Sequence, residues 1–351
     1  MTFVSSLKYE DELTTAQKQR VVSGMQRLRE CFHAKGEPPL RTMDDTVIIA
    51  TWNLREFGKS KFGYRGPEPY YYIASIIDRF DLVALQEIRS LYALQHLCGL
   101  LGSHWSYLIT DVTLGPGGNA ERMAYLYDNR KVRFSGLAAE LVLPDKNKKT
   151  AVQLARSPYI AGFHAGWAQI NLCTVHIYYG KALKDDPRRV REIKDLASTI
   201  ATNARGYYSG RAPRNDDSSR RKPEDILLLG DFNIFNREDV TMEALTGAGF
   251  KVPEALGQIP GSNVERDKHY DQIAYYKQTA TMQATGRAGV FDYFEHVYRD
   301  ADASVYTSEV PKGSFANWRT FQMSDHLPMW CEFRIDSMDE YLNQLAKGLE
   351  H

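Results

Sequence analysis

The longest aliphatic run of the chain ends in a turn that presents polar side chains. Residues 226–229 are Ile-Leu-Leu-Leu, Gly230 follows them, and Asp231 and Asn233 come next. Side chains two residues apart point to the same face of an extended segment. The pattern therefore predicts a buried strand whose carboxyl end offers a carboxylate and a carboxamide to one site.

Three other apolar runs end in the same way. The segments 47–52, 82–86 and 173–175 run into Asn53, Glu87 and His176 in turn. Ligand sites in α/β sheets lie beyond the carboxyl ends of the strands. We therefore expect these polar residues to share one site.

Two further polar motifs precede their strands instead of following them. Asp325 and His326 come directly before a strand predicted at 327–333, and Asp271 comes before a short element at 272–276. If these strands run antiparallel to their neighbours, their beginnings lie at the same sheet edge as the ends of the others. The same mouth would then receive all of these side chains.

Composition excludes some broad classes of protein. The chain has 351 residues, of which 43% are hydrophobic and 25% charged, and its formal net charge is zero, so nothing in the overall charge indicates a polyanion partner. No run approaches the roughly 20 apolar residues that span a bilayer. The N-terminus lacks the pattern of a signal peptide, and the four cysteines form no CxxC pair. We expect a cytoplasmic protein, with export by an unusual route left open.

The ends of the chain predict helices outside one large domain. Thr14 and Gln17 have the spacing of a capping box, and apolar residues recur at helical spacing from Val21 to Phe32. Ser337 and Glu340 repeat that spacing near the C-terminus. We predict an N-terminal helical extension packed on the main domain (1–42), a catalytic domain (43–336) and a short C-terminal helix or tail (337–351).

Strands and helices alternate from Val47 onward. We predict helices from about Pro69 and through Leu91, short strands at 104–111, 122–128, 157–163 and 167–178, and a further short element at 318–322. A helix after Pro187 should bury its apolar face and expose its arginines and lysines to water. Residues 206–224 lack periodicity and predict a mobile loop. The basic and aromatic loop at 57–68 is either a solvated turn or one wall of a phosphate-binding groove.

The expected cluster has a definite chemistry. Carboxylates without any cysteine ligand suit a hard cation, namely Mg²⁺ or Mn²⁺, with Ca²⁺ as a further candidate. A carboxylate beside a histidine fixes the tautomer of the imidazole and raises the pKa of the histidine. Two imidazoles beside such a metal indicate phosphoester hydrolysis, in which the metal polarises a phosphoryl oxygen while a base and an acid move protons.

The motifs VIIATWNL, LVALQEIRS, LLLGDFN, YDQIAY and SDHLPMW occur in this order along residues 47–333. This series resembles that of the endonuclease/exonuclease/phosphatase superfamily, and its DNase I-like branch matches best. The resemblance implies an α/β fold of four layers, in which two packed mixed β-sheets are flanked by helices. One departure is Gln272, which stands where arginine or histidine is commoner.

The resemblance also implies roles for single residues. Asn53, Glu87 and Asp325 match metal-binding positions. Asp231 matches the residue that orients or activates the attacking water. His326 with Asp271, and His176 with Glu121, match the two acid–base histidines and their carboxylate partners. The positions that match phosphate or substrate contacts are Asn233, Arg156 and Arg55.

These implications predict a divalent-metal-dependent phosphodiesterase, a nuclease that hydrolyses DNA, with RNA as a further substrate. The expected partner is nucleic acid, and no protein partner is predicted. An alternative keeps the site but changes the substrate to a phosphoinositide, sphingomyelin or a nucleotide, since fold does not settle substrate. A catalytically silent scaffold is a third alternative, which the complete ligand set disfavours.

Overall fold

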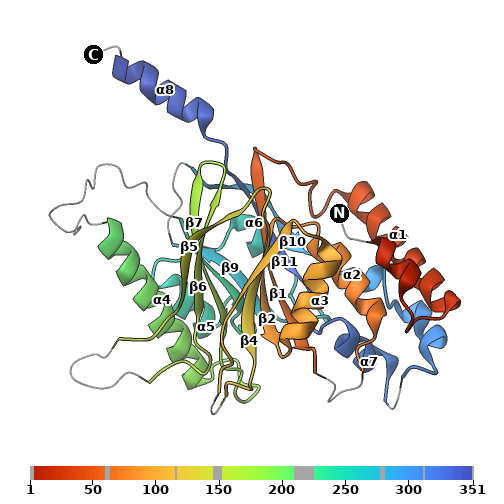
Figure 1. The fold of residues 1–351 in the computed structure, drawn as a ribbon. Coiled ribbons are helices and arrows are strands. Elements are labelled where there is room, and N and C mark those ends of the chain that lie inside the picture. Colours follow the sequence, from red (N-terminus) through yellow and green to blue (C-terminus); the bar gives the residue numbers. More distant parts are fainter. Residues whose placement is uncertain are drawn as a thin grey trace.

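The computed structural model describes residues 4–59, 64–114, 117–144, 152–208, 225–276, 281–310 and 313–349. Two mixed β-sheets pack face to face at its centre (Figure 1). The first sheet has six strands, in the order β10 (Gln283–Val290), β11 (Met329–Arg334), β1 (Thr46–Phe57), β2 (Leu82–Ile88), β4 (Arg122–Asp128) and β3 (Trp105–Ile109). The second has five, in the order β5 (Arg133–Glu140), β6 (Tyr159–Ala165), β7 (Ala168–His176), β8 (Asp225–Asp231) and β9 (Asp271–Tyr275).

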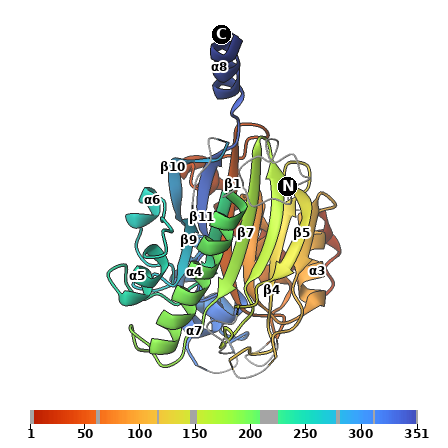
Figure 2. The ribbon, with the colours of Figure 1, turned by 90° about the vertical axis from the view of Figure 1, so that its left-hand side faces the viewer.

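Helices cover the outer face of each sheet. α1 (Thr15–Lys35), α2 (Pro67–Ile77) and α3 (Leu91–Leu101) lie outside the first sheet, and α4 (Pro187–Tyr208) and α5 (Val240–Thr246) lie outside the second (Figures 1 and 2). The shorter helices are α6 (Glu254–Gly257), α7 (Phe315–Gln322), η1 (Val4–Tyr9), η3 (Tyr293–Glu295) and η4 (Asp300–Tyr306). α8 (Met338–Leu349) follows β11 and projects from the body. The predicted four-layer sandwich is confirmed.

The alternation of side chains along the strands explains the three apolar layers. In β1, Ile48 and Trp52 pack under the helices, whereas Val47 and Ile49 point into the layer between the sheets. Side chains of a strand alternate between its two faces, so a central strand that is apolar at every position can fill two layers at once. This is why the runs that are apolar throughout lie at the centre of the sandwich.

Strand directions bring the predicted residues to one end of the sandwich. β1 runs parallel to β2, and β7 runs parallel to β8. β11 pairs antiparallel with β1, and β9 pairs antiparallel with β8, so both strands begin where their neighbours end. In the second sheet this register places Asp271 directly opposite Asp231. The expectation that Asp271 and His326 enter the same mouth is confirmed by the topology.

Several sequence expectations differ from the structure. β5 and β10 were not expected, and residues 318–322 belong to helix α7. α4 continues through Tyr208, so the predicted loop begins too early, and residues 209–224 lie outside the described part of the chain. Arg189 was expected to face water but is fully buried. Its guanidinium donates hydrogen bonds to backbone carbonyls, including those of Tyr178 and Leu183.

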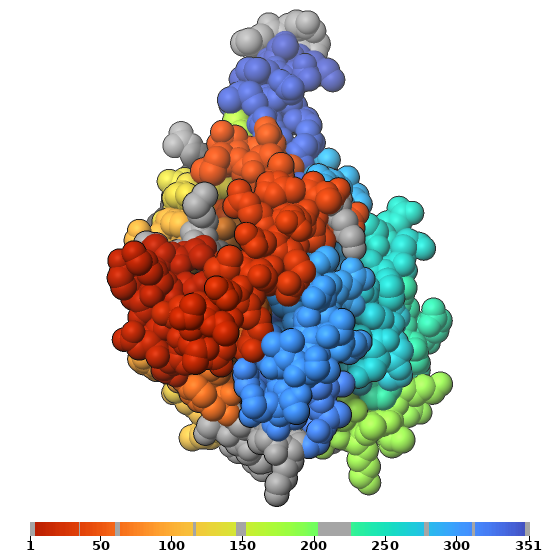
Figure 3. All heavy atoms as spheres, turned by 90° about the vertical axis from the view of Figure 1, so that its right-hand side faces the viewer, coloured from red at the N-terminus to blue at the C-terminus, as the bar shows by residue number. Residues whose placement is uncertain are grey.

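The N-terminal helix α1 is packed into the body of the protein. Val21, Leu28 and Phe32 belong to the apolar layer under the first sheet, and the predicted capping box at Thr14 is present. Arg20 reaches from α1 to Glu68 at 2.5 Å and to Glu309 at 2.8 Å. Figure 3 shows the N-terminal segment lying beside the segment that follows β10.

Two other predictions about the whole chain are not tested by the contacts described above. The domain boundaries at residues 42 and 336 stay a prediction, and so does the cytoplasmic location. Among the described residues, no helix combines the length and the apolar character needed to cross a bilayer.

The contact between α1 and α2 leads to a stability prediction. A Cβ atom on Gly24 would lie 2.5 Å from the hydroxyl of Tyr72 and 2.6 Å from its ring. Tyr72 is buried and its hydroxyl donates to Glu68, so the ring has no room to move aside. We expect Gly24→Val to lower the free energy of unfolding by about 1–3 kcal/mol, measured by urea denaturation.

The matched control is the same change at Gly99 in α3. There an added Cβ atom meets nothing within 4 Å. We expect Gly99→Val to change stability by less than about 0.5 kcal/mol. Equal stability of the two variants would contradict the close packing of α1 on α2.

Candidate active site

The strand end at Asp231 and Asn233 is a tight turn held by its own side chains. Gly230 has a φ of 135°, and a Cβ atom there would lie 2.2 Å from the carbonyl oxygen of Val175. Asn233 also has a positive φ of 53°, and its backbone N–H donates to Asp231 Oδ1 at 2.9 Å. Its side-chain amide donates to the carbonyl of Ile177 at 2.8 Å. The turn therefore fixes the Asp231 carboxylate at the end of β8.

Asn53 links this carboxylate to the first sheet. Its Nδ2 atom lies 3.0 Å from Glu87 Oε1 and 3.0 Å from Asp231 Oδ2. β1 is irregular just after Asn53, and both Arg55 and Glu56 have positive φ values. This distortion lets the N–H of Arg55 donate to Asn53 Oδ1 at 3.0 Å, and that of Glu56 donate to Glu87 Oε2 at 2.8 Å.

His326 is held by Asp271, as the resemblance to the superfamily implied. Its Nδ1 atom lies 2.8 Å from Asp271 Oδ2, and both side chains are buried. Ser262 donates to the same oxygen at 2.7 Å, and Ser324 accepts from the backbone N–H of His326 at 3.0 Å. Burial alone lowers the pKa of His326, but the charges of Asp271 and Asp231 outweigh it and raise that pKa well above its usual range.

His176 and Glu121 form a second pair of this kind. His176 Nδ1 lies 2.5 Å from Glu121 Oε1, and Arg156 contacts the same carboxylate oxygen. Burial raises the pKa of Glu121 to about 7, although Arg156 and Arg89 oppose this shift. Burial, together with the charge of Arg156, lowers the pKa of His176 to about 4. Near neutral pH, His176 is therefore uncharged and His326 is charged.

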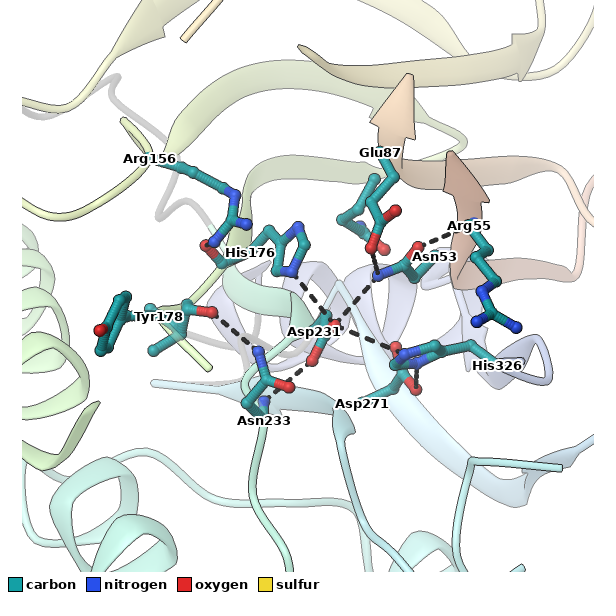
Figure 4. Close-up of polar contacts among 12 residues, drawn as sticks. Asn53, Arg55, Glu87, Arg156, His176, Tyr178, Asp231, Asn233, Asp271 and His326 are labelled. Carbon is teal, nitrogen blue, oxygen red and sulfur yellow. Dashed lines mark hydrogen bonds and ion pairs between the residues drawn. The ribbon is translucent and has the colours of Figure 1, made fainter. Parts of the chain in front are cut away.

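The two imidazoles face the same carboxylate oxygen from opposite sides (Figure 4). His176 Nε2 lies 3.5 Å from Asp231 Oδ2, and His326 Nε2 lies 3.6 Å from it. Burial raises the pKa of Asp231, while the two histidines lower it in part. A neutral and a cationic imidazole thus flank one buried carboxylate, an arrangement suited to moving protons in both directions.

Comparison with known proteins gives relatives with nuclease names. No model of a protein family matches the chain. It is 30% identical over 192 residues to a protein named deoxyribonuclease from Thioalkalivibrio sp. (strain K90mix). That match covers 53% of this chain and 46% of the relative. The chain is 24% identical over 219 residues to endonuclease/exonuclease/phosphatase family domain-containing protein 1 of Xenopus laevis, which covers 57% of this chain and 34% of that one. The matched region thus spans less than half of either curated relative.

Solved structures with the same architecture cover most of the chain. The catalytic domain of human Nocturnin with a bound sulfate anion aligns with a TM-score of 0.55 at 14% identity, over 82% of this chain and 93% of that one. TDP2 of D. rerio complexed with a single-strand DNA product aligns with a TM-score of 0.53 at 14% identity, over 83% and 99%. An endonuclease/exonuclease/phosphatase family protein from Leptotrichia buccalis aligns with a TM-score of 0.52 at 14% identity, over 82% and 99%. The chain has the endonuclease/exonuclease/phosphatase fold.

In this fold the buried cluster offers a fitting donor set for a divalent cation. Asp231, Asp271 and His326 each place a ligand atom within 4.8 Å of those of the others. Asp271 Oδ1 is buried and has no hydrogen-bond partner among the described residues. The amide nitrogen of Asn53 lies between the carboxylates of Glu87 and Asp231. A cation at this second position would also be stabilised by these two carboxylates. The carboxylate and amide oxygens suit a hard cation, whereas His326 can serve as a ligand only after it loses a proton, because a charged imidazole has no free lone pair.

Asp325 and Arg55 lie at the edge of this cluster. The side chain of Asp325 is 41% exposed and pairs with Arg55 Nε at 3.3 Å. Arg55 also donates to Thr320 and lies 3.7 Å from the centre of the Phe321 ring. Asp325 therefore does not join the buried carboxylates in this structure, and its role as a metal ligand stays a prediction. Arg156 likewise faces Glu121, so its predicted contact with phosphate stays untested.

Some residues that hold the site were missed by sequence reasoning. Ser262 and Ser324 support the His326 pair, and only Ser324, directly before Asp325, stands in a recognisable motif. Arg65 was grouped with the basic loop as a candidate for the groove, but it is buried and donates to the carbonyls of Arg55 and Phe321. It braces the end of β1 against the end of α7. Residues 60–63 of that loop lie outside the described part of the chain.

The Asp271–His326 pair leads to a prediction about charge. A carboxylate beside an imidazole favours its protonated form, so Asp271→Asn should lower the pKa of His326 substantially. Asp325 also raises that pKa but is a weaker cause, so Asp325→Asn should lower it less. The measurement is an NMR titration of the histidine ring protons in protein kept free of metal with EDTA. An equal drop in both variants would contradict the dominant role of Asp271.

Proposed function

We propose that this chain is a divalent-metal-dependent phosphodiesterase, a DNase I-like nuclease that hydrolyses DNA. One observation carries the proposal. Two carboxylate–histidine pairs and Asn53 converge on a single oxygen of Asp231. These groups come from separate strand ends, and a structural salt bridge would not need two histidines in opposite charge states.

The residues divide between holding a cation and moving protons. Glu87 and Asn53, with an oxygen of Asp231, would hold the metal, and Asp325 is a further candidate at the edge. The bound metal would polarise a phosphoryl oxygen and offset the negative charge that gathers there. Asn233, whose amide is fixed by the carbonyl of Ile177, and the arginines Arg55 and Arg156 would bind phosphate oxygens.

The proton transfers follow from the two pKa shifts. The proton of neutral His176 lies on Nδ1, which donates a hydrogen bond to Glu121. Nε2 therefore keeps a free lone pair and can accept a proton from water. Asp231 accepts a hydrogen bond from the same water and orients it toward phosphorus. The new P–O bond forms as the bond to the leaving oxygen breaks, and cationic His326 donates its Nε2 proton to that oxygen. Asp271 stabilises the cation until the transfer.

DNA is the proposed substrate for two reasons. The chain shares 30% identity with a protein named deoxyribonuclease, and a structure with the same fold is described as a complex with a single-strand DNA product. The test is a panel of linear and circular DNA, RNA, inositol phosphates, sphingomyelin and nucleotides with Mg²⁺ or Mn²⁺. Cleavage of DNA supports the proposal. Release of phosphate or headgroup without DNA cleavage would replace it with the alternative substrate class.

Removal of single site residues should abolish turnover. We expect Asp231→Ala and His326→Ala each to lower kcat on DNA by about 10²–10⁴-fold, because each removes a positioned proton-transfer or water-orienting group. Asp185→Ala, an exposed aspartate, is the matched control and should retain the wild-type rate. Circular dichroism confirms folding of each variant. Wild-type rates in the site variants would contradict the assignment.

Metal binding should be visible without any substrate. Excess EDTA should stop cleavage, and added Mg²⁺ or Mn²⁺ should restore it. Because a ligand that binds only the folded state adds about 2.7 kcal/mol at 100 times its Kd, saturating metal should raise the Tm by several degrees. We expect Glu87→Gln to lose most of this increase, while Glu254→Gln, an exposed glutamate of α6, keeps it. An undiminished increase in Glu87→Gln would rule Glu87 out as a principal ligand.

A further inference from the structure

Three aromatic rings form a cluster beside the candidate active site. Tyr179, Phe235 and Tyr270 lie with ring centres 5.5–6.3 Å apart, and we call them the aromatic platform. The rings of Tyr179 and Tyr270 meet edge to face. Phe235 is buried, Tyr270 is half-buried, and Tyr179 is 40% exposed. The platform therefore has a packed base and one ring that faces water.

Each ring belongs to a segment that also carries a site residue. Tyr270 directly precedes Asp271, Phe235 follows Asn233 by two residues, and Tyr179 follows His176 by three. The ring of Tyr270 also lies 5.5 Å from that of His326. A phosphodiester held by Asn233 and His326 would thus place one of its neighbouring nucleotides over the platform.

A buried arginine holds the exposed tyrosine in place. Arg189 of α4 donates to the backbone carbonyls of Tyr178 and Leu183 at 3.2 and 3.1 Å, and also to that of Tyr179. Its guanidinium lies 4.8 Å from the centre of the Phe235 ring and 5.5 Å from that of Tyr179. Burying a guanidinium is costly unless its donors are satisfied, and here they are satisfied by the loop that carries Tyr179.

This construction distinguishes Tyr179 from an ordinary surface tyrosine. The ring of a surface tyrosine is usually mobile, whereas Tyr179 is held by the hydrogen bond from Arg189 to its backbone carbonyl and by the contacts of its ring with Phe235 and Tyr270. A rigid aromatic surface loses little conformational freedom when it binds a flat partner. Stacking of a base on such a ring is worth about 1–3 kcal/mol and tolerates any base, because every base has a π-face.

We propose that Tyr179, supported by Phe235 and Tyr270, stacks against the base of a nucleotide next to the scissile phosphate. The inference rests on the proposed function and refines its substrate class. A base can reach the platform only when it leaves its neighbours in the strand, so single-stranded or locally unpaired nucleic acid is the preferred substrate. Tyr179 is therefore a specificity-determining residue, separate from the groups that transfer protons.

The experiment compares Tyr179→Ala with Tyr179→Phe and with Tyr92→Ala. The first removes the ring, the second keeps it, and the third changes a tyrosine of α3 that is 78% exposed and does not belong to the aromatic platform. Substrates are a single-stranded oligonucleotide and the same strand with tetrahydrofuran abasic residues in place of its nucleosides. Initial rates give KM and kcat separately, and fluorescence anisotropy in EDTA gives the Kd for the uncleaved strands.

We expect Tyr179→Ala to raise KM and Kd for the base-containing strand at least about 5-fold, the lower bound for the loss of one stacked base. The preference of the wild type for bases over abasic residues should shrink by the same factor. Tyr179→Phe should restore most of the preference, and Tyr92→Ala should match the wild type. An equal loss on abasic strands would assign Tyr179 a structural role and overturn the inference.

The result also separates this inference from the proposed function. If the wild type cleaves DNA and Tyr179→Ala keeps its KM, its Kd and its preference for bases, the platform is not a stacking site while the nuclease stands. If the wild type neither cleaves nor binds any strand, the proposed function fails and the stacking role fails with it.

Discussion

The carboxylate of Asp231 is withdrawn from water, and donors from both sheets gather around one of its oxygens. An isolated carboxylate at such a depth would be protonated or would destabilise the fold. Here the amide of Asn53 and the rings of His176 and His326 provide the compensation. The strand directions, the irregular end of β1 and the tight turn after β8 all serve to bring these groups together.

The same requirement explains why each histidine has its own carboxylate partner. Asp271 keeps His326 charged, while burial and the charge of Arg156 keep His176 uncharged beside Glu121. Two pairs of the same kind thus reach opposite charge states, because burial and the charge of Arg156 together lower the pKa of His176, whereas the charges of Asp271 and Asp231 outweigh burial at His326. Electrostatic asymmetry of this kind sets apart acid and base in a shared pocket.

Most of the fold and much of the candidate site could be predicted from the sequence, because both depend on strong local patterns. The apolar runs of β1, β2, β7 and β8 and the polar residues at their ends indicated both the sheets and their common edge. β5 and β10 were not predicted, because they are edge strands whose positions are exposed or mixed and which contain several glycines and alanines. Apolar and polar residues therefore do not alternate along them. The position of Asp325 was also out of reach, since its pairing with Arg55 depends on where α7 packs.

Buried arginines show a different limit of sequence reasoning. Arg65 and Arg189 stand in basic segments that predict solvated surface, yet both are buried and bind backbone carbonyls. Those carbonyls come together only after folding, and no spacing in the sequence records them. Sequence patterns reveal which residues can do chemistry more readily than which ones hold the loops in place.

Asn53 and Glu87 lie in the first sheet and His326 directly precedes its strand β11, whereas His176, Asp231 and Asp271 lie in the second sheet. The constellation therefore straddles the seam between the two sheets, which is held by the apolar contacts of the inner layer together with hydrogen bonds such as those from Gln86 to Thr174 and from Tyr125 to Tyr159. A change of shape at Phe163, which lies in that inner layer and outside the candidate site, would shift one sheet against the other. Such a change would lower activity while the protein is still folded, because the packing of the inner layer sets the relative positions of the two halves of the site.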